Sequence, residues 1–151
     1  MNKYIKEAYK EALKSLAIDE VPVGAVIVKD NKIIARAYNK KENDNNPIGH
    51  AEILVIKKAC KKLGSWRLSD CDIYTTLEPC TMCLGAIIHS RINCVYYCAI
   101  DNRFGAIEGA YELLKVGKFN HHLKSEYIKE LECSKILSEY FKTKRKKSNQ
   151  N

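Results

Sequence analysis

The chain has 151 residues, of which 46% are hydrophobic and 29% charged, an ordinary composition for one globular domain. No apolar run approaches the roughly 20 residues that a membrane-spanning helix needs, and residues 1–14 alternate charged and apolar side chains where a signal peptide would carry an apolar stretch. We therefore expect a single domain at 1–147 and a disordered polar tail at 148–151, in a cytoplasmic protein that is neither membrane-embedded nor secreted by an ordinary signal.

The chain contains seven cysteines. In a reducing cytosol cysteines remain thiols or bind metals, whereas secreted domains use them in disulfide frameworks. An odd number also fits such a framework poorly. We therefore expect thiols and metal ligands.

The net charge of +8 is concentrated near the C-terminal end, where five positive side chains follow one another closely: Lys142, Lys144, Arg145, Lys146 and Lys147. A basic segment of this kind suits a polyanionic partner such as nucleic acid. It is also typical of a solvated tail, so charge alone leaves both interpretations open.

Hydrophobic spacing predicts a helix and a hairpin in the first third of the chain. Apolar residues at helical spacing predict an amphipathic helix over about 3–17. Strands are predicted at 23–29 and 32–39, joined by a two-residue turn at Asp30-Asn31, because both side chains tolerate the backbone conformations of such turns. The polar segment 40–49 is predicted to be a loop.

The middle of the chain alternates helices and strands. Residues 51–63 predict a helix that is apolar nearly all round and therefore belongs in the core or at a subunit interface, and residues 80–90 predict another helix. Strands are predicted at 72–77 and 93–100. This succession favours an α/β fold with parallel neighbouring strands in one sheet covered on both faces.

The last third is predicted to be irregular before a closing helix. Residues 101–122 contain three glycines and surround a short helix, which is typical of a functional loop region. Residues 129–146 carry an apolar stripe and predict the closing helix.

Cys80 and Cys83 lie three residues apart at the start of a predicted helix. Both sulfurs can face one metal ion there, and the helix N-terminus favours thiolates. The same spacing occurs in thioredoxin-like redox sites. His50 favours the metal, because it begins another helix after a strand and can supply a third ligand. Three protein ligands leave the fourth position for water, which is the arrangement of catalytic zinc.

Glu52 lies two residues from His50, so the two converge on a metal only if the metal sits at the first turn of the helix. A carboxylate there can accept a proton from zinc-bound water and return it to a leaving group. Alternatively, it merely complements the helix N-terminus. The other five cysteines are interpreted as small core residues: Cys60, Cys71, Cys94, Cys98 and Cys133. Three further histidines remain possible metal ligands: His89, His121 and His122.

The ordered motifs His50-Ala51-Glu52 and Pro79-Cys80-Thr81-Met82-Cys83 resemble the signature of the zinc-dependent nucleoside and base deaminases. Within that superfamily the chain is most similar to the bacterial branch that converts adenosine to inosine at the wobble position of tRNA anticodons. The similarity covers nearly the whole chain and includes the segments 20–26, 76–83, 88–92, 120–121 and 138–142.

This resemblance implies a three-layer α/β/α cytidine-deaminase-like fold with a mixed sheet of about five strands, one Zn²⁺ per subunit, and a homodimer whose second subunit completes the pocket. It implies that His50, Cys80 and Cys83 hold zinc, that zinc-bound hydroxide attacks C6 of adenine, and that Glu52 shuttles protons. It also implies base contacts from Asn39, Val21 and Pro79, and anticodon-loop contacts from Asp101, Asn120, His121, Tyr140, Phe141 and Arg145.

The sequence departs from the family pattern at two places. Gly49 stands where the family usually has Ala, and the segment 101–110 differs from the corresponding family loop. Arg103 and Phe104 could preserve charge and stacking there, while Glu108 adds a negative charge. These departures concern substrate contacts and leave the zinc chemistry intact.

Two other functions would use the same motifs. A deaminase of a free base or nucleotide, of the guanine, cytosine or dCMP type, would share the zinc site but has no evident use for the Asn-His segment or the basic helix end. A non-catalytic RNA-binding module stabilised by zinc would need neither Glu52 nor an open metal position.

Overall fold

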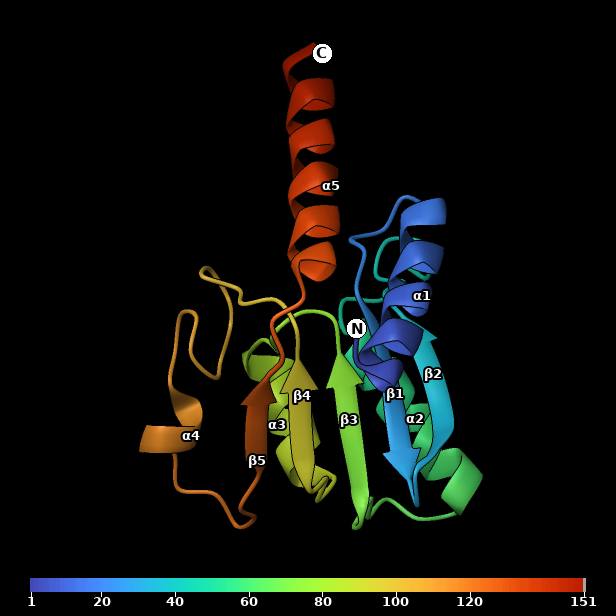
Figure 1. Ribbon diagram of the computed structural model, residues 1–151, viewed down its shortest axis with the longest axis vertical. Coiled ribbons are helices and arrows are strands. Elements are labelled where there is room, and N and C mark those ends of the chain that lie inside the picture. The colour runs from blue at the N-terminus through green and yellow to red at the C-terminus, as the bar shows by residue number, and fades with distance from the viewer. Residues whose placement is uncertain (151) are drawn as a thin grey trace.

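In the computed structural model the chain forms one mixed five-stranded sheet with helices on both faces (Figure 1). The structure describes residues 1–150, the last two by their backbone alone. The spatial order of the strands is β2-β1-β3-β4-β5, and their bounds are β1 (Gly24–Lys29), β2 (Lys32–Tyr38), β3 (Cys71–Thr75), β4 (Cys94–Tyr97) and β5 (Lys124–Tyr127). β1 runs antiparallel to both of its neighbours, whereas β3, β4 and β5 are parallel.

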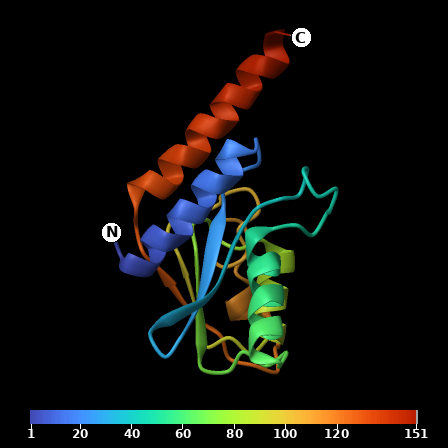
Figure 2. The same cartoon turned by 90° about the vertical axis from the view of Figure 1, so that its right-hand side faces the viewer.

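The helices complete three layers, as the sequence predicted. α2 (Ala51–Leu63) and α3 (Thr81–His89) lie on one side of the sheet, and α1 (Lys3–Ala17) and α5 (Leu131–Gln150) on the other (Figure 2). A short helix, α4 (Leu113–Val116), interrupts the connection from β4 to β5. Among the described residues, no helix is long and apolar enough to cross a membrane.

The predicted hairpin is confirmed. Asp30 and Asn31 have φ angles of 50° and 62° and join β1 to β2. A two-residue turn with positive φ at both positions matches the twist of the strands, and Asp and Asn are among the side chains that tolerate it. β1 is buried along nearly its whole length because α1 packs against one of its faces and α2 against the other.

The predicted parallel pairing of neighbouring strands is confirmed for β3 and β4 but not for β2 and β3. β1 lies between β2 and β3 and pairs antiparallel with both, so the connection through α2 does not make β2 and β3 neighbours. β5 lies within a stretch in which no strand was predicted. Three of its four residues are exposed, so it shows no apolar alternation, and its backbone pairing with β4 defines it.

Two expectations about helices change in the structure. The helix that was expected to be buried on several sides, α2, buries Ala51, Val55 and Ala59. The side chains of Ile53 and Leu54 remain half-exposed. α5 continues through Gln150 and extends beyond the sheet (Figure 1). Residues 148–150 of the expected disordered tail therefore belong to this helix, and residue 151 lies outside the described residues.

Cys98 and Cys133 form a disulfide, which corrects the expectation that all cysteines outside the metal site are free. Both side chains are fully buried, as expected of core residues. The bond connects the end of β4 to the first turns of α5, across 35 residues of sequence. The spacing gave no sign of this pairing, because the fold alone brings the two segments together.

Candidate active site

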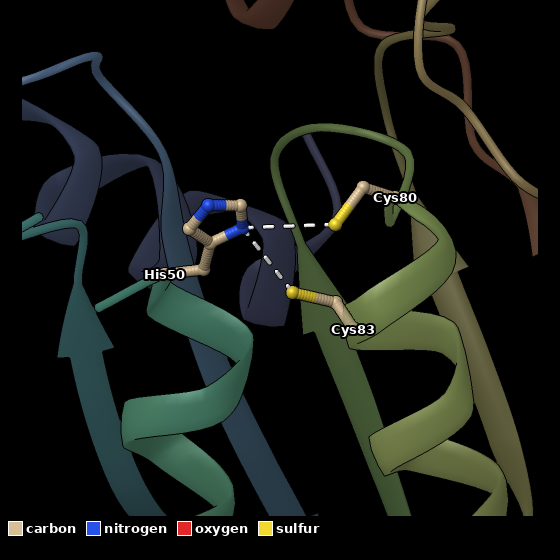
Figure 3. A group of neighbouring side chains, drawn as sticks. All are labelled: His50, Cys80 and Cys83. Carbon is tan, nitrogen blue, oxygen red and sulfur yellow. Dashed lines mark hydrogen bonds between the residues drawn. The ribbon is translucent and has the colours of Figure 1, made fainter. Parts of the chain in front are cut away.

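The three predicted metal ligands meet where two helices begin. His50 immediately precedes α2, Cys80 immediately precedes α3, and Cys83 lies in the first turn of α3. Their side chains point toward one another (Figure 3). Nδ1 of His50 lies 3.7 Å from Sγ of Cys80 and 3.4 Å from Sγ of Cys83, and the ligand atoms of all three residues lie within 4.8 Å of one another.

This donor set fits zinc. A tetrahedral Zn²⁺ with one nitrogen at about 2.1 Å and two sulfurs at about 2.3 Å separates its donors by roughly 3.5–3.8 Å, close to the observed distances. A hydrogen bond from Cys83, with a smaller contribution from His50, lowers the pKa of the Cys80 thiol to about 4. A thiolate is therefore ready to bind a cation.

Glu52 is buried in the first turn of α2, with 4% of its surface exposed. It lines the same cavity as His50 and Cys80, which is the convergence that the spacing allowed only at the first turn of a helix. Burial raises the pKa of its carboxyl group. A carboxyl group whose pKa is raised holds a proton more firmly than an exposed one, as a group that takes up and passes on a proton requires.

The cavity at this site measures about 480 Å³, within the range of about 300–1,000 Å³ usual for small-molecule sites. Four of the predicted substrate-binding residues line it: Val21, Asn39, Asp101 and Phe141. Asn39 is 93% buried, and its Nδ2 donates to the carbonyl oxygen of Val21 at 3.4 Å. The position of these four residues at the cavity is compatible with base contacts, which stay a prediction.

A basic groove adjoins the cavity. It measures about 700 Å³ and lies between the segment after β4 and helix α5. Phe104 and Phe141 line both the groove and the cavity, and three cationic side chains line the groove: Arg103, Lys144 and Arg145. Arg145, predicted to contact RNA, thus lies in the groove rather than in the cavity.

The structure does not bring Asn120 and His121 to the cavity. Nε2 of His121 donates to the carbonyl oxygen of Ile92 at 2.6 Å, just before β4, whereas Asp101 follows the other end of that strand. Within one chain, the Asn120-His121 segment that was predicted to contact RNA therefore lies at the opposite end of the strands from the cavity.

Two further predicted contacts are placed elsewhere. Tyr140 faces the turn that follows α1, where its hydroxyl donates to the carbonyl oxygen of Asp19 at 3.4 Å. Pro79 does not line the cavity, and its carbonyl oxygen accepts from the N–H of Ala106 at 2.9 Å.

Sequence reasoning missed six residues that line the cavity: Val23, Lys41, Leu77, Glu78, Thr81 and Tyr111. Tyr111 and Lys41 come from irregular segments whose course the pattern could not predict. Glu78 is 1% exposed, and its position two residues before Cys80 within the matching segment was the available signal. Phe104, for which a stacking role was suggested, lines the cavity as well, and that role stays a prediction.

Comparison with known proteins agrees with this geometry. A family model described as MafB19-like deaminase matches residues 1–145. The chain is 46% identical to the tRNA-specific adenosine deaminase of Bacillus subtilis, over 95% of this chain and 90% of that protein. It is 42% identical to the tRNA-specific adenosine deaminase of Aquifex aeolicus, over 92% of each.

Solved structures give the same picture. A structure from a study of A-to-I editing by tRNA:A34 deaminases at the wobble position of tRNA superposes with a TM-score of 0.80 and 41% identity, covering 83% of this chain and 96% of that one. The guanine deaminase of Bacillus subtilis superposes with a TM-score of 0.64 and 34% identity, covering 94% and 95%. Identity and fold together thus place the chain in the deaminase family, in the group of the tRNA-specific adenosine deaminases.

Proposed function

We propose that the protein hydrolyses the adenosine at the wobble position of a tRNA anticodon to inosine, with release of ammonia. One observation carries the proposal. His50, Cys80 and the buried Glu52 line a cavity that adjoins a basic, aromatic groove, and Cys83 completes the group of candidate metal ligands beside it. A cavity for one base beside a groove for a charged strand is what an enzyme needs to act on a splayed-out base of an RNA loop.

His50, Cys80 and Cys83 would hold a zinc ion. When bound, such an ion lowers the pKa of a water molecule so that it acts as a nucleophile near neutral pH. Glu52 faces the same cavity, takes the proton that this water loses on attacking C6, and delivers a proton to the amino group that leaves C6 as ammonia. Water and adenosine thereby give inosine and ammonia, and Glu52 returns to its starting state.

The walls of the cavity would orient the base. The Asn39 side chain carries both a donor and an acceptor, so it can pair with a purine edge. Phe104 and Phe141 offer aromatic surface where the cavity meets the groove, and unstacked bases pack well on such surfaces. Arg103 and Arg145 would hold the phosphates of the flanking nucleotides, whereas Lys144 pairs with Asp19 at 2.6 Å.

The alternative with a specific observation behind it is deamination of a free base, because a guanine deaminase shares 34% identity and the fold. Two features favour RNA. The identity to the tRNA-specific deaminases is higher, and the groove presents three cationic side chains that a neutral free base would not require.

An experiment that separates these functions offers the purified zinc-loaded protein an anticodon stem-loop with adenosine at the wobble position, and in parallel free adenosine, guanine and cytidine. We expect inosine in the stem-loop alone. Glu52→Gln should retain zinc and lose deamination, whereas Glu42→Gln, at an exposed position of the same charge, should retain both. Ammonia from a free base alone would overturn the proposal.

We also propose that the protein acts as a homodimer in the cytoplasm, where its proposed substrate is found. Two features of the α2 and α3 surface support a dimer. Ile53 and Leu54 leave half-exposed apolar surface on α2, and Gly85 lies in the middle of α3 with open space where a side chain would begin. Glycine lowers helix stability, so its presence there favours a close approach by another chain.

A further inference from the structure

Glu78 is a buried carboxylate beside the candidate metal site that the proposed mechanism does not use. It lies between β3 and Cys80, and 1% of its surface is exposed. Its two carboxylate oxygens accept four backbone N–H groups of the segment 101–109. Oε1 accepts from Asp101 at 3.0 Å, and Oε2 accepts from Ile107, Glu108 and Gly109 at 2.9, 2.7 and 3.0 Å.

The segment 101–109 wraps closely around this carboxylate. The N–H of Gly105 donates to the carbonyl oxygen of Asp101 at 2.9 Å, which closes a turn. A Cβ atom at Gly105 would overlap the carboxyl group of Glu78, and one at Gly109 would overlap the carbonyl of Asp101. The two glycines therefore permit the approach, and the four hydrogen bonds account for the charge buried there.

This arrangement links two parts of the site. Glu78 is two residues from the metal ligand Cys80, and the segment that it holds contributes Asp101 and Phe104 to the cavity. Three of the four N–H groups donate to Oε2 and one to Oε1. Because only 1% of the residue is exposed as well, the carboxylate is engaged with the protein itself rather than presented to a substrate.

We propose that Glu78 is a positioning residue that fixes the 101–109 segment, and through it the affinity for RNA, without contacting the substrate. This inference rests on the proposed function. The segment that Glu78 holds is also the one in which the sequence departs from the family pattern, so the loop can differ in its side chains while its path is set by a buried anion.

The variant Glu78→Gln tests the proposal, because an amide nitrogen would face N–H groups that now donate to an oxygen. Amide hydrogen exchange at 101 and 107–109 should become faster by about tenfold or more. The KM for the anticodon stem-loop should rise by about tenfold or more, with kcat and zinc content near those of the unmodified protein. Glu112→Gln removes an equal charge at an exposed position on the following segment and should change none of these.

Unchanged exchange at 101 and 107–109 would overturn the proposal, as would a fall in kcat without a rise in KM, or loss of zinc. Glu78→Asp keeps the carboxylate one methylene shorter and should recover part of the loss. It also serves as the test variant if Glu78→Gln does not fold. The exchange measurement needs no substrate, so a protein that fails to deaminate the stem-loop refutes the proposed function while the exchange result still decides the role of Glu78.

Discussion

Nδ1 of His50 lies 3.4 Å from Sγ of Cys83, although 33 residues separate them in the sequence. The two atoms meet because α2 and α3 lie side by side on one face of the sheet and both begin at the same edge of it (Figures 1 and 3). A metal ion held here would connect the N-terminal ends of two helices that are separated along the chain by β3. Metal binding should therefore contribute to stability as well as to chemistry.

Removing the metal should destabilise the protein. At free zinc about 100-fold above its dissociation constant, binding to the folded state adds about 2.7 kcal/mol to the free energy of unfolding. We expect chelation to lower the melting temperature and abolish deamination, and added zinc to restore both. His50→Ala should be insensitive to the chelator. A melting curve that is identical with and without bound zinc would contradict this prediction.

The Cys98–Cys133 disulfide predicts how the thiols react. Protein purified and denatured without reductant should present five alkylatable cysteines, and seven after reduction. Closing a loop of 35 residues stabilises the folded state by about 4 kcal/mol in the chain-entropy treatment. Reduction should therefore lower the free energy of unfolding, and Cys60→Ala, outside the disulfide, should leave that response unchanged. Seven reactive thiols before reduction would refute the disulfide.

The sequence predicted those parts of the fold and site that depend on local pattern. The turn at Asp30-Asn31, the helix starts at His50 and Cys80, and the position of Glu52 in a first turn all follow from neighbouring residues. The parts that it did not predict depend on long-range packing. The Cys98–Cys133 bond has no local signature, and β5 is defined by its pairing with β4 rather than by its own residues.

His121 gives a further prediction, because the resemblance assigned it to RNA whereas the structure pairs it with the Ile92 carbonyl oxygen. His121→Ala should lower the free energy of unfolding by about 1 kcal/mol, the net contribution of one such hydrogen bond. The KM for the stem-loop should stay the same. The adjacent His122 is exposed, so His122→Ala is the matched control for stability. A raised KM with unchanged stability would restore the RNA contact and place it across a dimer.

The basic groove predicts a salt dependence. If Arg145 pairs with one phosphate, Arg145→Gln should reduce the slope of the logarithm of affinity against the logarithm of salt concentration by about 0.7. Titrations of the stem-loop onto Glu52→Gln protein at several salt concentrations would measure this without turnover. Lys61→Gln, at an exposed position on α2, should leave the slope unchanged. Equal slopes for all proteins would make the basic end of α5 a solvated tail.

Gly85 provides the test of the dimer, because substitutions there are sterically free within one chain. If nothing packs on α3, Gly85→Ala should raise the free energy of unfolding by about 0.5–1 kcal/mol through helix propensity alone. If a second chain approaches closely, the added methyl group should weaken the dimer, and Gly85→Arg should give monomers in sedimentation. Glu132→Arg, exposed on the α5 side of the sheet, should sediment like the unmodified protein. An unmodified protein that sediments as a monomer at micromolar concentration would refute the dimer.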